Sequence, residues 1–174
     1  MAEDIGENLV GSYLRYVEQC DFIVYNAQYP TVQSEIDVVG MRLSGGHREI
    51  WFCEVITHID GTLYGTYEKT MLKLEAKILR AREFANAMFP DPADHHRFEI
   101  WSPVVPVGKL TTQFEEMERR HNDDALDLHF VINGEYTARI QALIDHARTH
   151  SAATSDSAYR LLQVLTRLRG TLTV

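Results

Sequence analysis

The sequence predicts an α/β protein built on one mixed β-sheet with helices packed against it. Its 174 residues suit a single compact domain, and 45% hydrophobic with 24% charged residues is typical of globular proteins. Helical and strand patterns also alternate along the chain, in the order α-β-β-β-α-β-α-β-α-α. We therefore expect one domain over residues 1–174, with a core over about 5–107 and a C-terminal strand and helices over 108–174.

The first half should contain one helix and then three strands. Apolar residues repeat with the 3.6-residue helical period over Ile5–Gln19, and Asp4 can cap the start. Three segments rich in β-branched and aromatic residues follow, namely Phe22–Ala27, Ser34–Leu43 and Glu49–His58. Gly45 and Gly46 predict a hairpin turn between the last two, so those strands should lie side by side.

The longest helix is expected over Tyr67–Met88, where an apolar stripe runs until Phe89 and Pro90 end it. His95 and His96 should lie in a loop. The later elements should be a strand over Phe98–Val105, a helix over Leu110–His121, a strand over Leu126–Ile132, and helices over Glu135–His150 and Ser157–Arg169.

Charge and composition exclude several classes of protein. The formal net charge is −8, which disfavours binding to nucleic acid by charge alone, although residues 61–90 carry more bases than acids. No apolar run approaches the roughly 20 residues of a membrane span, and no secretory signal is recognisable. We therefore expect no membrane partner and a cytoplasmic location. The two cysteines, Cys20 and Cys53, are too few for a disulfide framework.

Three carboxylates have a spacing that suits a metal site. Glu7 lies in the first turn of the first helix, Asp37 in the second strand and Glu54 in the third. If the second and third strands form a hairpin, Asp37 and Glu54 can lie side by side on one face. Clustered carboxylate oxygens suit Mg²⁺ or Mn²⁺, which activate water and stabilise phosphoryl oxygens. The alternative is that these are solvated carboxylates.

The segments around these acids resemble a known superfamily. Their order is Gly-Glu at 6–7, Ser-Glu-Ile-Asp-Val-Val at 34–39 and Trp-Phe-Cys-Glu-Val-Ile-Thr at 51–57. It is similar to the restriction-endonuclease-like (PD-(D/E)xK) superfamily, above all to YraN-type predicted endonucleases and Holliday-junction resolvases, and the resemblance covers about residues 5–88. It implies a restriction-endonuclease-like fold and Mg²⁺- or Mn²⁺-dependent hydrolysis of DNA phosphodiester bonds. Glu7, Asp37 and Glu54 would be the metal ligands.

One position departs from the family pattern. The signature lysine, which positions the attacking water and offsets charge in the transition state, is replaced by Ile56. A lysine from the following helix can compensate, and we place Lys73, in the middle of the stripe Lys69, Lys73 and Lys77, in the catalytic set. The choice among these lysines stays open, as do compensation by His58 and a solvated role for the stripe. On this pattern, Ile56→Lys should create or raise nuclease activity.

Two hypotheses therefore remain. The chain is either a metal-dependent DNA endonuclease, or a catalytically inactive nuclease-fold protein that binds nucleic acid or acts in assembly. Apolar faces on the last two helices suit a homodimer as well as a core. His146 and His150 have the i,i+4 spacing of zinc ligands, but no third ligand is evident in the sequence.

Overall fold

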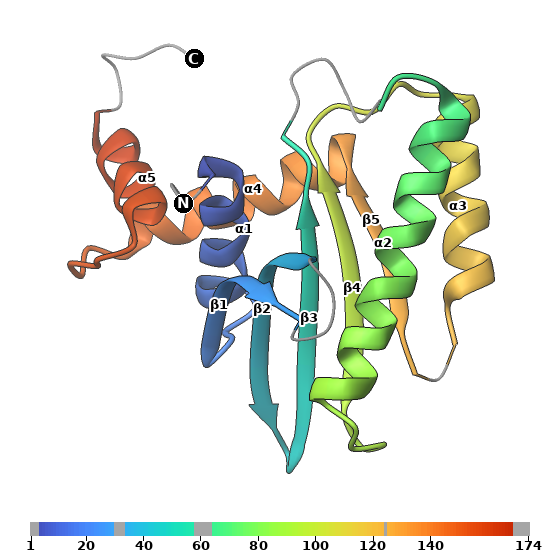
Figure 1. Ribbon diagram of the computed structural model, residues 1–174. Coiled ribbons are helices and arrows are strands. Elements are labelled where there is room, and N and C mark those ends of the chain that lie inside the picture. The colour runs from blue at the N-terminus through green and yellow to red at the C-terminus, as the bar shows by residue number, and fades with distance from the viewer. Residues whose placement is uncertain (1–3, 30–33, 58–63, 124, 169–174) are drawn as a thin grey trace.

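The structure is a computed structural model that describes residues 4–29, 34–57, 64–123 and 125–168. It confirms the predicted mixed α/β class and the predicted element order, with one five-stranded sheet and helices on both of its faces (Figure 1). The elements are α1 (Ile5–Tyr16), β1 (Phe22–Gln28), β2 (Glu35–Ser44), β3 (His47–Val55), α2 (Tyr67–Met88), β4 (His95–Ser102), α3 (Lys109–His121), β5 (Asp127–Ile132), α4 (Asn133–Thr149) and α5 (Ser157–Arg167).

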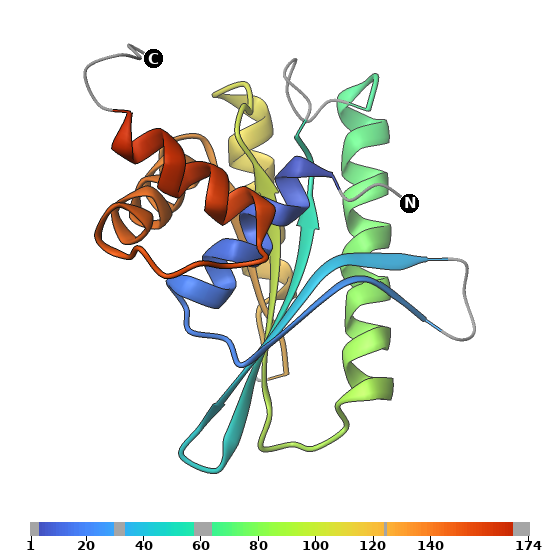
Figure 2. The same ribbon diagram turned by 90° about the vertical axis from the view of Figure 1, so that its left-hand side faces the viewer.

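The sheet has the strand order β1-β2-β3-β4-β5. β1, β2 and β3 pair antiparallel, and the hairpin predicted from Gly45 and Gly46 joins β2 to β3. β3, β4 and β5 pair parallel, which requires a crossover between each pair, and α2 and α3 provide these crossovers. α1 and α4 cover the other face, with α5 packed outside them (Figure 2).

A hydrophobic core lies on each face of the sheet. Phe52 of β3 packs in the core formed with α2 and α3, whereas Trp51 packs in the core formed with α1 and α4. Neighbouring residues of a strand point to opposite faces, so a strand buried on both sides has a continuous apolar sequence. β3 accordingly lies inside the sheet, between β2 and β4.

Some predicted element boundaries were wrong. His95 and His96 belong to β4 rather than to a loop, because they pair in parallel register with Glu49 and Ile50 of β3. The first helix ends at Tyr16, three residues early, and Gln19 beyond it has a left-handed φ of 60°. Such pairing and capping depend on contacts that a local pattern does not contain.

Within the described residues, no helix is both long enough and apolar enough to cross a membrane.

Candidate functional site

Two of the predicted carboxylates face each other where β2 and β3 separate. Val38 pairs with Cys53 in the antiparallel ladder, so Asp37 and Glu54 are opposed one step further along. The Oδ2 atom of Asp37 accepts a hydrogen bond from the backbone N–H of Val55, with an N–O distance of 2.7 Å. This bond ties the Asp37 side chain to the end of β3 beside Glu54.

Glu54 is buried and forms an ion pair with a lysine of α2. Its side chain shares a strand face with Phe52, which packs against α2, and the residue is only 2% exposed. The Nζ atom of Lys77 donates a hydrogen bond to Oε2 of Glu54. Ile78, the next residue of α2, is fully buried, so this part of the helix is held against the sheet and Lys77 lies at the edge of the core.

The charges of this group affect one another strongly. Burial and the neighbouring Asp37 carboxylate raise the pKa of Glu54 to about 7, although Lys77 acts in the opposite direction. Burial lowers the pKa of Lys77, but the attraction of Glu54 and Asp37 outweighs it and leaves that pKa above the usual value. The ammonium group therefore stays charged at neutral pH.

Glu7 approaches the same group from α1. Asp4 caps the helix by accepting a hydrogen bond of 2.7 Å from the N–H of Gly6. A Cβ atom on Gly6 would lie 2.2 Å from Cγ2 of Thr57, so the glycine lets the first turn of α1 pack against the chain just after β3. Burial, together with repulsion from Asp37, raises the pKa of Glu7.

The structure brings Lys77, rather than Lys73, to Glu54. The Nζ atom of Lys73 instead lies 4.3 Å from the ring centroid of Tyr64, and Lys69 is exposed in the first turn of α2. Successive lysines of this stripe are about 6 Å apart along the helix axis. The alignment of α2 against β3 therefore decides which of them reaches the carboxylate.

Two other residues considered in the sequence analysis are Ile56 and His58. Ile56 is 4% exposed and belongs to the core formed with α2 and α3, and its N–H donates a hydrogen bond of 2.8 Å to the carbonyl oxygen of Trp101. His58 lies outside the described residues.

The donor set suits a divalent cation held by two protein ligands. Asp37 and Glu54 provide hard carboxylate oxygens beside the Lys77 ammonium, and Glu7 is close enough for repulsion from Asp37. Among the residues that the structure describes, no three His, Cys, Asp or Glu side chains lie close enough to hold a metal ion together. Mg²⁺ is commonly held by one or two carboxylates with water as its other ligands, so Asp37 and Glu54 fit this mode and Glu7 is not needed as a ligand.

No family model matches the chain, and no match is found among the curated proteins or the solved structures.

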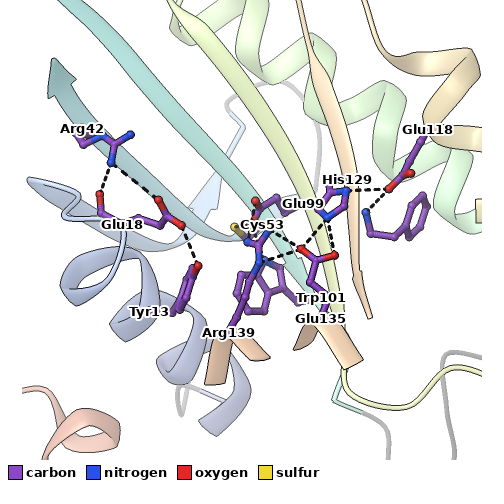
Figure 3. Close-up of polar contacts among 11 residues, drawn as sticks. Tyr13, Glu18, Arg42, Cys53, Glu99, Trp101, Glu118, His129, Glu135 and Arg139 are labelled. Atoms are coloured by element: carbon purple, nitrogen blue, oxygen red, sulfur yellow. Dashed lines mark hydrogen bonds and ion pairs between the residues drawn. The ribbon is translucent and has the colours of Figure 1, made fainter. Parts of the chain in front are cut away.

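A second polar cluster, which the sequence analysis missed, lies on the opposite face of the sheet (Figure 3). Glu99 of β4 is 3% exposed, and both of its carboxylate oxygens lie 3.0 Å from Nη1 of Arg139 on α4. The Nε1–H of Trp101 donates a further hydrogen bond of 2.9 Å to Glu99. The sequence does contain a sign of this pair, because Glu99 stands within the apolar run 98–101 and a buried carboxylate needs a partner of opposite charge.

This cluster continues to the edge of the sheet. Arg139 also pairs with Glu135 at 2.9 Å, and Glu135 lies 2.8 Å from Nε2 of His129 on β5. The Nδ1 atom of His129 lies 3.0 Å from Glu118 of α3. Each charge here has a partner of opposite sign, so the cluster is suited to joining α3 and α4 across β5 rather than to binding a ligand.

The two histidines of the i,i+4 pair are also engaged with each other. The rings of His146 and His150 stack with centroids 3.8 Å apart, and Nδ1 of His146 lies 2.6 Å from the hydroxyl oxygen of Tyr159. Within the described ranges, no third ligand joins them in a metal-binding group.

Proposed function

We propose that this chain is a Mg²⁺- or Mn²⁺-dependent DNA endonuclease of the restriction-endonuclease-like kind, in which Lys77 replaces the signature lysine. The observation that carries the proposal is the contact of Lys77 with Glu54. Ile56 occupies the position of the usual lysine and is buried, so it provides no charge. Lys77 provides an ammonium group at the same carboxylate from a different element.

The residues have distinct roles in this proposal. Asp37 and Glu54 would hold the divalent ion, with Asp37 oriented by the N–H of Val55. A divalent ion held there supplies positive charge for phosphoryl oxygens and lowers the pKa of a bound water. Lys77 has a raised pKa, so its role is to stabilise negative charge on the scissile phosphate rather than to accept a proton. Glu7 adds to the negative potential that attracts the cation.

The second candidate is a catalytically inactive nuclease-fold module that binds nucleic acid or acts in assembly. It is favoured by the ion pair itself, because Lys77 already compensates the charge of the buried Glu54 carboxylate. Several apolar side chains of α5 and its C-cap are also exposed, as a surface for assembly requires; these are Leu161, Val164 and Leu165 in the helix and Leu168 just after it.

The experiment that separates these candidates is cleavage of branched, single-stranded and duplex DNA with Mg²⁺ or Mn²⁺. Wild type should cleave at least one substrate, and Glu54→Ala and Asp37→Asn should abolish the cleavage. Glu115→Ala, at an exposed carboxylate of α3, is the matched control and should cleave like wild type.

Metal binding is measured in parallel as the rise in melting temperature on adding Mn²⁺. The rise should disappear in Glu54→Ala and persist in Glu115→Ala. Absence of both cleavage and this rise in wild type would leave the inactive module as the better proposal.

A further inference from the structure

The lysines of this chain are gathered at one end of the sheet. The whole sequence contains four lysines, Lys69, Lys73, Lys77 and Lys109, against a net charge of −8. Three lie in the first half of α2, and Lys109 is the first residue of α3. α2 and α3 both begin at the end of the sheet where β3 and β4 run out, as Figure 1 shows. Lys77 is paired with Glu54, so the exposed lysines Lys69, Lys73 and Lys109 are the ones that place positive charge at this end of an acidic protein.

Two of these lysines lie over tyrosine rings. The Nζ atom of Lys73 is 4.3 Å from the ring centroid of Tyr64, and that of Lys109 is 5.4 Å from the ring centroid of Tyr67. Lys73 and Lys109 are exposed, and Tyr67 is 38% exposed. Each of these two cations thus lies against an aromatic ring at this end of the sheet.

The surface formed by these lysines and tyrosines reaches the candidate site. Lys73, which lies over the Tyr64 ring, is about one helical turn before Lys77, which contacts Glu54. Burial raises the pKa of Tyr64, and the carboxylates of Glu54 and Asp37 raise it further, while Lys77 acts in the opposite direction. From Lys77 to Tyr67, α2 extends about 15 Å along its axis. The surface is therefore long enough to contact more than one nucleotide beyond the reacting phosphate.

The exposed groups near these lysines in the chain include apolar ones. Val107, two residues before Lys109, is 87% exposed, and Val104 is also exposed. Glu68 is an exposed carboxylate in the first turn of α2. Apolar side chains beside lysines and tyrosines suit a partner that presents both charge and flat apolar surface.

An unpaired polynucleotide strand has this chemistry. Its phosphates attract lysines and its exposed bases stack on aromatic rings, whereas the bases of a duplex are stacked on one another and do not reach such rings. We propose that Tyr67 and Lys109, with Tyr64 and Lys73, bind an unpaired strand and lead it to Asp37 and Glu54. This deepens the proposed function and rests on it for the reaction that follows binding.

The test is binding of fluorescein-labelled dT12, followed by fluorescence anisotropy in EDTA so that no cleavage occurs. Wild type should bind dT12 more tightly than a 12-base-pair duplex. Tyr67→Leu and Lys109→Gln should each weaken binding about fivefold or more. Arg119→Gln, at an exposed residue in the last turn of the same helix as Lys109, is the matched control and should bind like wild type. A labelled U12 arm distinguishes an RNA strand from a DNA strand.

Three outcomes would overturn the inference: wild type does not bind dT12, it prefers the duplex, or Lys109→Gln and Arg119→Gln weaken binding equally. Melting curves by circular dichroism establish that each variant is folded. If the protein cleaves no DNA but binds dT12 in a way that depends on Tyr67 and Lys109, the proposed binding surface is supported and the proposed reaction is not. The opposite result is a wild type that cleaves DNA, with Tyr67→Leu and Lys109→Gln matching it in both cleavage and dT12 binding. That result would support the proposed reaction and reject the proposed binding surface.

Discussion

The ammonium group of Lys77, on α2, pairs with the buried carboxylate of Glu54, on β3, two residues before the buried Ile56. The two partners are 23 residues apart in sequence and come from different layers of the fold. The contact exists because α2 crosses back over the sheet on the face to which Glu54 points. Asp37, opposite Glu54 on β2, completes a group of two carboxylates and one cation.

Replacement of Lys77 should therefore impair the reaction itself. If the chain cleaves DNA, Lys77→Met should lower kcat by about 10²–10⁴-fold, because a positioned charge is lost from the transition state. Lys73→Met should change KM more than kcat, since Lys73 lies over Tyr64. Steady-state kinetics on one substrate measures both. A larger loss of kcat in Lys73→Met than in Lys77→Met would assign the catalytic role to Lys73.

Ile56→Lys should destabilise the protein. The family pattern alone implies a gain of activity, but Ile56 is part of the core and Lys77 already contacts Glu54. Burying an ammonium there and losing the apolar side chain should lower the free energy of unfolding by about 2–4 kcal/mol, whereas Ile56→Leu should cost less than about 1.5 kcal/mol. Urea denaturation measures both values. Equal stability of Ile56→Lys and wild type would mean that the side chain at position 56 reaches solvent.

The buried pair of Glu99 and Arg139 should be important for stability. Arg139→Met leaves the Glu99 carboxylate buried without its cation and should lower the free energy of unfolding by about 3–5 kcal/mol. Adding Glu99→Gln to that variant should restore part of the loss. Arg148→Met, which breaks a solvent-exposed pair with Asp145 on the same helix, should cost less than about 1 kcal/mol. A loss in Arg139→Met as small as in Arg148→Met would contradict the buried pairing.

His129 should make stability depend on pH in the alkaline range. The hydrogen bond to Glu118, and the further bond to Glu135, outweigh burial and raise the pKa of His129 to about 9. The ordinary histidine pKa is about 6.5, so the folded protein binds the proton more tightly than the unfolded chain. The stabilisation should be complete below about pH 6.5 and disappear as the pH rises through about 9.

The measurement is the melting temperature of wild type and His129→Gln between pH 6 and pH 10. The difference between them should be largest at pH 6 and shrink toward pH 10. His47→Gln, at an exposed histidine of β3, serves as the control for a histidine replacement outside this cluster. A constant difference between wild type and His129→Gln would rule out this linkage.

Replacing each of two helical glycines by alanine should change the stability of the protein in opposite directions. A Cβ atom on Gly11 of α1 would lie 2.2 Å from the hydroxyl oxygen of Tyr25, whereas nothing lies within 4 Å of one on Gly134 of α4. Gly11→Ala should therefore destabilise by about 1–3 kcal/mol through overpacking. Gly134→Ala should stabilise by up to about 1 kcal/mol, since alanine favours the helix. Thermal unfolding of both variants tests the contact of α1 with β1.

Local patterns were sufficient to predict the mixed class, the element order and the helix Tyr67–Met88, whose limits agree with the structure. They also predicted that Asp37 and Glu54 lie on neighbouring strands, because the hairpin at Gly45 and Gly46 joins those strands directly. They did not predict that His95 and His96 extend β4, because those residues become strand only by pairing with β3.

The sequence by itself determined the order of the helices and strands and the choice of three candidate acids, since helix and strand periods, caps and turns act between residues close in the chain. The tertiary structure decided which lysine contacts Glu54. The lysines Lys69, Lys73 and Lys77 are evenly spaced, and no pattern of neighbouring residues shows how far along β3 the helix α2 is positioned. The tertiary structure also decided that Glu99 is paired with Arg139 across 40 residues. Both contacts depend on how a helix packs on the sheet, and that packing is set by side chains distant in sequence that share one core.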